Sequence, residues 1–242
     1  MPARLPEIVL VDSSREAPPP SPLEARAREL LGQDVAVKAL GREVVAQRGD
    51  GLLVLGASGV AQPVTGLEGA IQWPPSALPG GRGALVLSTA NHGLAYRLWQ
   101  VRFAEPVAQL LVKGGAEAGE DDGDLVSWSR AAGVSGGYVV LGDDRLCLVG
   151  EDGTVRDEAP HGDLTELETI FDGRCVVLSE DEGPTLLFAV AGDRLVRLAE
   201  LPADPRDIVV EGTRVFWTDF ATEDGRCREA VGLHDALVAA GA

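Results

Sequence analysis

The chain has 242 residues, of which 45% are hydrophobic, so it can bury a core and is not globally disordered. Its formal charge of −17 arises from 38 acidic and 21 basic residues. A field of that sign repels phosphate backbones and anionic membranes, which disfavours direct binding to nucleic acid or to a membrane. The same charge favours a solubilising surface, a surface that steers a basic partner, or a mimic of nucleic acid.

The sequence indicates a bacterial protein of the cytoplasm. Its first eleven residues carry one Arg and an apolar run of only four residues, Ile8 to Val11, which is too short for a secretion signal. No window approaches the roughly 18 apolar residues of a membrane span. The cysteines, Cys147, Cys175 and Cys227, lack the spacing of a disulfide framework. Nearly all basic residues are Arg, a bias typical of GC-rich bacterial genomes.

The first 34 residues predict a strand, a proline-rich connector and a helix. Glu7 to Val11 is mostly apolar and favours a strand, and three consecutive prolines exclude a helix after it. Ser21-Pro22-Leu23-Glu24 has the pattern of a capping box with proline at the first helical position. An apolar stripe follows at helical spacing, and Gly32 is a natural end for this short helix.

From Val35 onward, five segments share one pattern: a glycine, a few extended apolar residues and a small or polar end. They are Gly51–Gly56, Gly83–Ser88, Gly137–Gly142, Gly173–Ser179 and Gly212–Asp219. Their leading glycines are separated by 32, 54, 36 and 39 residues, and the long gap contains an acidic loop that we interpret as an insertion. A period of about 35–40 residues with several short strands is typical of β-propeller blades, because one four-stranded sheet cannot cover both of its faces alone.

One of these segments also carries a resemblance to a known family. Asp207–Asp219 ends in Phe216-Trp217-Thr218-Asp219 and resembles the blade motif of YWTD-type propellers, which has Tyr-Trp-Thr-Asp at that place. The match is close over 13 residues and loose over Gly136–Asp224, and the other segments read Val-Val-Leu-Gly or Val-Val-Leu-Ser there. The resemblance implies a β-propeller fold.

We therefore predict an all-β protein, a β-propeller-like array of short antiparallel sheets with a short N-terminal helix. The predicted units are residues 1–34, a propeller-like domain over 35–227, and a C-terminal helix or tail over 228–242. An irregular sandwich or barrel is one alternative. An α/β fold is another, because Ile8–Leu40 could form a βαβ unit. In a propeller, the N-terminal strand could instead complete the last blade.

The sequence contains no convincing catalytic motif. His92, His161 and His234 are isolated from one another and from the cysteines, so we interpret them as surface or loop residues rather than zinc ligands. Gly133–Gly137 matches the Gly-x-Ser-x-Gly pattern of hydrolase nucleophiles. That chemistry needs a helix after the serine, whereas Tyr138–Leu141 predicts a strand. We assign no catalytic residue and no cofactor.

An acidic cluster is the one candidate metal site. Carboxylates gather between Glu117 and Asp124, and loops of this kind can bind calcium. The alternate-position ligand pattern is missing, and charge runs in loops are usually solvated. If a cation binds there, Asp121, Asp122 and Asp124 are the candidate ligands.

The four tryptophans, at positions 73, 99, 128 and 217, have two interpretations. Trp73 precedes two prolines in a predicted loop, and Trp99 would share one face of a strand with Arg97. An exposed aromatic beside an arginine is typical of a binding hot spot. Trp73, Trp99 and Arg97 are therefore candidate partner-binding residues. The alternative places all four tryptophans in the core.

These observations favour a non-enzymatic protein-interaction module, an adaptor or accessory subunit of a larger bacterial cytoplasmic complex. Propeller faces are wide and rigid, and their loops can vary without disturbing the blades. We expect a protein partner with a basic surface, and no direct contact with nucleic acid or membrane. One alternative is a lactonase-like propeller hydrolase with carboxylates converging on the central channel. Another is an acidic nucleic-acid mimic.

Overall fold

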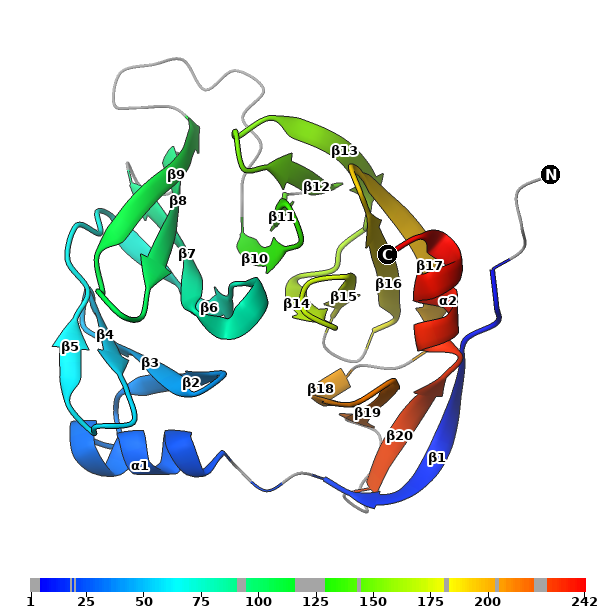
Figure 1. Ribbon diagram of the computed structural model, residues 1–242, viewed down its shortest axis with the longest axis horizontal. Helices are drawn as coiled ribbons and strands as arrows, with labels where there is room; N and C mark the ends of the chain where they lie inside the picture. Colours follow the sequence, from blue (N-terminus) through cyan, green and yellow to red (C-terminus); the bar gives the residue numbers. More distant parts are fainter. Residues whose placement is uncertain are drawn as a thin grey trace.

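The computed structural model describes residues 5–17, 19, 21–90, 95–115, 129–142, 145–180, 183–202, 205–219 and 226–242. Within these ranges the chain forms five antiparallel sheets of four strands each, arranged as a ring around a common axis (Figure 1). The protein is therefore a five-bladed β-propeller, which confirms the predicted all-β fold and excludes the sandwich and α/β alternatives. In each blade we denote the strands A to D from the axis outward.

Four blades are built from consecutive strands. Blade 1 contains β2 (Ala36–Leu40), β3 (Glu43–Arg48), β4 (Gly51–Leu55) and β5 (Ala61–Pro63). Blade 2 contains β6 (Ala70–Ala77), β7 (Gly83–Ala90), β8 (Ala95–Arg102) and β9 (Ala108–Gly115), with the short 3-10 turn η1 (Pro79–Gly81) after β6. Blade 3 contains β10 (Arg130–Val134), β11 (Gly137–Leu141), β12 (Arg145–Gly150) and β13 (Val155–Pro160). Blade 4 contains β14 (Glu166–Ile170), β15 (Cys175–Ser179), β16 (Thr185–Ala191) and β17 (Arg194–Leu201).

Blade 5 combines the two ends of the chain. Its strands A to C are β18 (Pro205–Glu211), β19 (Arg214–Asp219) and β20 (Arg226–Val231), and its outer strand is β1 (Val9–Glu16). β1 pairs antiparallel with β20, with Val9 opposite Val231 and Asp12 opposite Arg228. The N-terminal strand thus completes the last blade.

Two helices pack against the ring. α1 (Pro22–Leu31) is the predicted N-terminal helix, and it lies against blade 1. The expected capping box does not form, because Ser21 makes no side-chain cap hydrogen bond. The Glu24 carboxylate instead accepts a hydrogen bond of 2.8 Å from the backbone N–H of Ala39 on β2. β2 is the innermost strand of blade 1 and pairs with a neighbouring strand on one side only. The second helix, α2 (Leu233–Ala240), buries Leu233 and Leu237 against blades 4 and 5.

The hydrophobic core lies between the blades. Separate clusters of buried side chains fill the junctions of blades 1 and 2, 2 and 3, 3 and 4, and 4 and 5, and a fifth cluster lies between α1 and blade 1. Strands that lie between two of these clusters are consequently covered on both faces. β11, for example, is buried at all five of its residues. This stacking is the physical reason for the recurrent apolar segments in the sequence.

The glycine-led segments mark strand B in four blades, as β7, β11, β15 and β19, but the Gly51 segment is strand C of blade 1. A Cβ atom at Gly83 would lie 2.5 Å from the carbonyl oxygen of Val101, and one at Gly137 would lie 2.2 Å from that of Val149. The glycine therefore allows strand C to approach closely. A Cβ atom at Gly51 would lie 3.5 Å from the carbonyl oxygen of Arg48, which is an ordinary contact. Gly51 is therefore not required for a close approach of two strands.

Candidate functional site

The structure places Trp99 in the core. Its side chain is 5% exposed in the cluster between blades 1 and 2, and its indole N–H donates a hydrogen bond of 2.8 Å to Ser88 Oγ. The predicted strand is β8, but inner strands of a propeller have both faces covered, so neither face of β8 presents an aromatic ring to a partner. The core interpretation of the tryptophans therefore applies to Trp99, and also to fully buried Trp217.

Trp73 and Arg97 lie closer to the surface than Trp99 does. Trp73 is half-buried and packs against the same core cluster. It lies in β6 rather than in a loop, where the pairing with β7 shifts register between Gln72 and Ser76. Arg97 is half-buried and forms an ion pair of 3.8 Å with Glu68. Partner binding by Trp73 and Arg97 stays a prediction.

Several other candidates lie outside the described residues. These are His92, Trp128 and the proposed cation ligands Asp121, Asp122 and Asp124. Among the residues that the structure does describe, no three His, Cys, Asp or Glu side chains are grouped to hold a metal ion. Neither of the helices within the described ranges has the length and apolar character of a membrane span. The cation site in the acidic loop stays a prediction.

The two remaining histidines have structural contacts. His161 is in a turn, as predicted, but it is buried, and its Nε2 atom lies 3.0 Å from the carbonyl oxygen of Gly142. His234 lies on α2, where its ring meets that of Phe171 edge to face with centroids 5.8 Å apart. These contacts involve a backbone carbonyl and an aromatic ring, and they hold each histidine within the fold.

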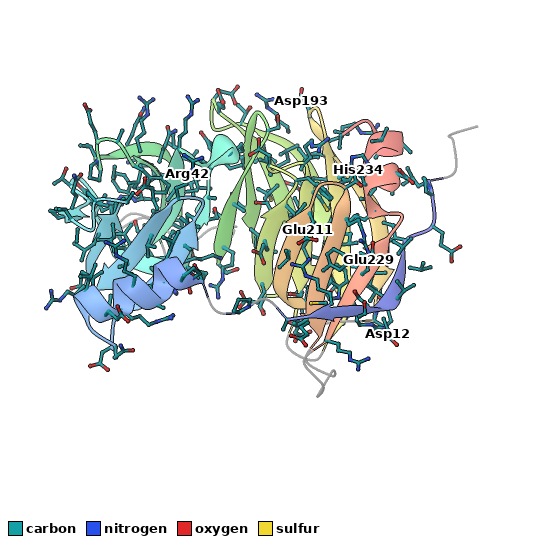
Figure 2. The ribbon with its side chains drawn as sticks, turned by 60° about the horizontal axis from the view of Figure 1, so that its bottom comes forward. Asp12, Arg42, Asp193, Glu211, Glu229 and His234 are labelled. Atoms are coloured by element: carbon teal, nitrogen blue, oxygen red, sulfur yellow. The ribbon has the colours of Figure 1, made fainter. Side chains whose placement is uncertain are left out.

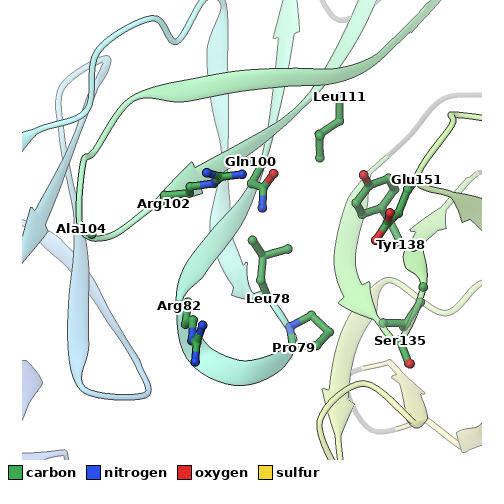
Figure 3. A pocket seen from close by; sticks show the side chains of 13 residues that line it. Leu78, Pro79, Arg82, Gln100, Arg102, Ala104, Leu111, Ser135, Tyr138 and Glu151 are labelled. Carbon is green, nitrogen blue, oxygen red and sulfur yellow. The ribbon is translucent and has the colours of Figure 1, made fainter.

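A groove of about 790 Å³ lies between blades 2 and 3, on the face of the ring that carries the A–B turns. We call it the blade 2–3 groove. Blade 2 contributes one wall, from η1 and from β8, and blade 3 contributes the other wall, from the turn between β10 and β11 and from the turn after β12 (Figure 3). The side chains used below are Leu78, Pro79, Arg82, Gln100, Arg102 and Leu111 on the first wall and Ser135, Tyr138 and Glu151 on the second.

Local backbone geometry places the polar groups of the blade 2 wall. Gly83 pairs with Arg102 between β7 and β8, and Arg82 directly precedes this pair. Gln100 and Arg102 are two residues apart on one strand and therefore share a face. The turn before Arg82 is held by hydrogen bonds from Gly81 N–H to Leu78 O, 2.9 Å, and from Leu78 N–H to Gly83 O, 3.0 Å.

These polar groups lack partners in the part of the chain that the structure describes. Among the described residues, none contacts the guanidinium groups of Arg82 and Arg102, or the amide of Gln100, through a hydrogen bond or an ion pair. Figure 3 shows Arg102 and Gln100 directed into the groove from one side and Tyr138 and Glu151 facing them from the other. The groove thus presents several donors that are available to a ligand.

Tyr138 adds a protonated hydroxyl. The residue is only 6% exposed, yet its side chain lines the groove. Burial, and to a smaller extent the nearby Glu151 carboxylate, raises the pKa of Tyr138 above its ordinary value. The phenol therefore remains a hydrogen-bond donor at neutral pH.

Ser135 is not part of a nucleophile elbow. It is exposed in a two-residue turn, because β10 and β11 form a hairpin with Val134 opposite Gly137. The following residues continue as β11 and not as a helix, as the sequence predicted. No histidine or cysteine lines the groove among the described residues. The Gly-x-Ser-x-Gly match is confirmed as a simple turn.

A hydrogen bond beside the groove joins two blades that are not neighbours in the ring. The backbone N–H of Gly80 in η1 donates to Asp172 Oδ1 at 2.6 Å. Gly80 belongs to blade 2 and Asp172 to the A–B turn of blade 4, where Phe171 and Asp172 both have positive φ, at 53° and 57°. This bond therefore links the turns on either side of blade 3.

Sequence reasoning missed the groove because its residues are ordinary and far apart. Gln100 and Arg102 come from one strand, but Arg82, Tyr138 and Glu151 come from three separate turns or strands. The only local signal was the Pro79-Gly-Gly-Arg82 turn, which predicts an exposed arginine at a tight turn.

No family model matches the chain, and no curated protein matches it. The solved structures that resemble it include a protein of unknown function from Bacteroides caccae, with 13% identity, a TM-score of 0.51, and coverage of 80% of this chain and 74% of that chain. An oligogalacturonate lyase in complex with manganese has 11% identity and a TM-score of 0.50, over 76% of this chain and 57% of the lyase. The β-propeller domain of Cps50 (Swd1) from Myceliophteria thermophila has 15% identity and a TM-score of 0.43, over 77% of this chain and 79% of that domain. At these identities the likeness shows the fold alone.

Proposed function

We propose that the chain is a non-enzymatic protein-interaction module, an adaptor or accessory subunit of a larger bacterial cytoplasmic complex. The blade 2–3 groove is the observation that carries the proposal. It offers two guanidinium groups, an amide and a phenol, which recognise a ligand by hydrogen bonds and charge. Its one aliphatic hydroxyl, on Ser135, has no histidine beside it within the described residues that line the groove.

The scaffold suits this role. A buried cluster joins blades 2 and 3, so the groove is formed by two rigid walls. Rigid walls reduce the conformational entropy that is lost when a partner binds. The resemblance to YWTD-type propellers is part of the same proposal, supported by the fully buried position of Trp217 on β19.

The charge of the molecule adds a preference among partners. With a formal charge of −17, the chain attracts basic surfaces at long range and accelerates their association. We therefore propose a protein partner with a largely basic surface. The described residues that line the groove include no histidine or cysteine, so nothing there favours the hydrolase alternative.

Affinity purification tests the proposal. The tagged chain, expressed at its native level, should copurify with a protein partner at a fixed stoichiometry, and the complex should persist through size-exclusion chromatography. Mass spectrometry identifies the partner, and a tagged unrelated acidic protein serves as the control. A chain that stays monomeric and hydrolyses lactone or ester substrates would overturn the proposal.

A further inference from the structure

The two walls of the blade 2–3 groove carry opposite charge. Arg82 and Arg102 lie on the blade 2 wall, and Glu151 lies on the blade 3 wall (Figure 3). Acidic residues outnumber basic ones in this chain by 38 to 21, so carboxylates are available to neutralise arginines. At several other positions they do so, as in the pairs of Arg130 with Glu166 at 3.2 Å and Arg214 with Glu229 at 2.6 Å.

In the groove, the described residues provide no such neutralisation. Among the described residues, no carboxylate lies within ion-pair distance of Arg82 or Arg102. A second observation points to a ligand in the same place: Tyr138 is more than nine-tenths buried, and its hydroxyl has no hydrogen-bond partner among the described residues. Arg102 and Gln100 on one wall thus face Tyr138 on the other, and none of the three has a side-chain partner among the described residues (Figure 3).

We propose that the groove binds an acidic side chain, Asp or Glu, from a segment of the partner protein. Arg102 holds its carboxylate, and Gln100 and Tyr138, together with Arg82 farther along the blade 2 wall, donate to the oxygens of the segment. A basic residue next to the acid lies toward Glu151. This inference rests on the proposed interaction function and specifies the chemistry that the partner presents.

Guanidinium chemistry favours a carboxylate. The planar group offers paired N–H donors that match the two oxygens of a carboxylate, and such charged hydrogen bonds are stronger than neutral ones. The remaining surface also matters, because a formal charge of −17 repels a free anion at long range. A segment with a basic residue beside its acid avoids this repulsion. Physiological salt screens exposed charges beyond about 8 Å, so the contacts within the groove then dominate.

The size and lining of the groove favour a segment of a protein over a small anion. A volume of about 790 Å³ exceeds the space that one carboxylate needs. Leu78, Pro79 and Leu111 line the groove between its charged ends, where they can pack against flanking apolar side chains (Figure 3). An extended peptide uses all of these contacts at once.

A selection from random peptides tests the inference before the partner is identified. Random dodecapeptides displayed on phage are selected on the immobilised intact chain, and the enriched peptides are synthesised and titrated by fluorescence anisotropy. We expect enrichment of Asp or Glu beside Lys or Arg. Arg82→Glu and Arg102→Glu should each weaken binding by about 10- to 100-fold, the range for charged hydrogen bonds.

Arg42→Glu is the matched control. Arg42 is an exposed arginine in the A–B turn of blade 1, and it is outside the groove lining (Figure 2). Its side chain has no partner among the described residues, so the substitution changes the net charge equally without touching the groove. Binding to this variant should stay within about 2-fold of the wild type. A peptide whose acid is replaced by Lys should bind Arg102→Glu better than it binds the wild type.

The outcomes separate this inference from the proposed function. If the selected peptides lack acids, or bind both groove variants as tightly as the wild type, the groove assignment is wrong. If no peptide is enriched while the partner protein binds wild type and Arg102→Glu equally, the groove assignment is wrong and the interaction function stands. If neither peptide nor partner binds, both are wrong.

Discussion

Ser88 is a fully buried serine whose hydroxyl connects two parts of blade 2. It accepts a hydrogen bond of 2.8 Å from Trp99 Nε1 and donates one of 2.6 Å to the backbone carbonyl of Glu68. Ser88→Ala would leave a buried indole N–H and a carbonyl without partners. We expect the free energy of unfolding to fall by about 1–3 kcal/mol, measured by urea denaturation.

Ser58→Ala is the control for this substitution. Ser58 is exposed, and its hydroxyl accepts only a long hydrogen bond of 3.4 Å from Val60 N–H. We expect a change within about 0.5 kcal/mol, as for other exposed positions. Equal effects of the two substitutions would show that the buried hydrogen bonds of Ser88 do not stabilise the blade.

The buried thiol of Cys175 makes the free energy of unfolding depend on pH. Burial raises the pKa of its thiol from 9.0 to about 12. The folded state therefore keeps the thiol neutral while the unfolded chain releases the proton above about pH 9. The free energy of unfolding should fall as the pH rises from about 9 towards 12, by up to about 1.4 kcal/mol per pH unit from this group.

Urea denaturation of the wild type and of Cys175→Ala between about pH 7 and pH 10.5 measures this contribution. The alanine variant loses packing at every pH, so the informative quantity is the slope against pH. Below about pH 8 the two slopes should agree, and above about pH 9 the wild type should fall more steeply. Parallel curves over the whole range would contradict a buried, neutral thiol.

At the scale of elements, adjacent glycines in the hairpin of blade 3 have different roles. A Cβ at Gly137 would lie 2.2 Å from the carbonyl oxygen of Val149, whereas Gly136 has φ +78° and open space around it. Gly137→Ala should therefore force strands B and C apart and lower the free energy of unfolding by about 3 kcal/mol. Gly136→Ala should cost about 1 kcal/mol of backbone strain.

Thermal and urea denaturation of both variants measure the difference. Far-UV circular dichroism at low temperature checks that each variant retains its sheet structure before the comparison is made. A larger loss for Gly136→Ala would show that the repeated glycine serves the turn rather than the approach of strand C.

The sequence pattern predicted most elements because the information is local. α1 follows from its apolar spacing and its proline, and the strand B segments follow from a glycine before a run of apolar residues. The pattern failed at Gly51, where another strand of the blade happens to start with glycine. It also failed at Trp73, because a strand with a register shift looks like a proline-rich loop.

At the scale of the whole molecule, β1 joins the N-terminal end of the chain to blade 5 at the C-terminal end. It buries Ile8 at its start, and Arg15 forms an ion pair with Glu211 and lies 4.9 Å from the ring centroid of Phe216. Deletion of residues 1–16 removes the outer strand of blade 5 and exposes the edge of β20. We expect a loss of at least about 3 kcal/mol, or a fall in Tm of roughly 6–12 °C.

Deletion of residues 1–4 is the control for this truncation, and it should leave Tm unchanged. A synthetic peptide of residues 5–17 added to the longer truncation should restore part of the lost stability, because it supplies the missing strand. Equal Tm values for the two truncated chains would show that the pairing of β1 with β20 does not stabilise the propeller.

The sequence by itself determined the repeated unit, the all-β class and the N-terminal helix, because these depend on spacing between residues a few positions apart. Only the tertiary structure decided that Val9 pairs with Val231, that Trp99 is buried, and that Arg82, Arg102 and Tyr138 share a groove. The alternation of apolar and polar side chains along a strand does not tell which face is buried when blades stack on both sides of the sheet. The packing of one blade on the next brings together residues that lie far apart in the chain, and no pattern of neighbouring residues indicates that they will meet.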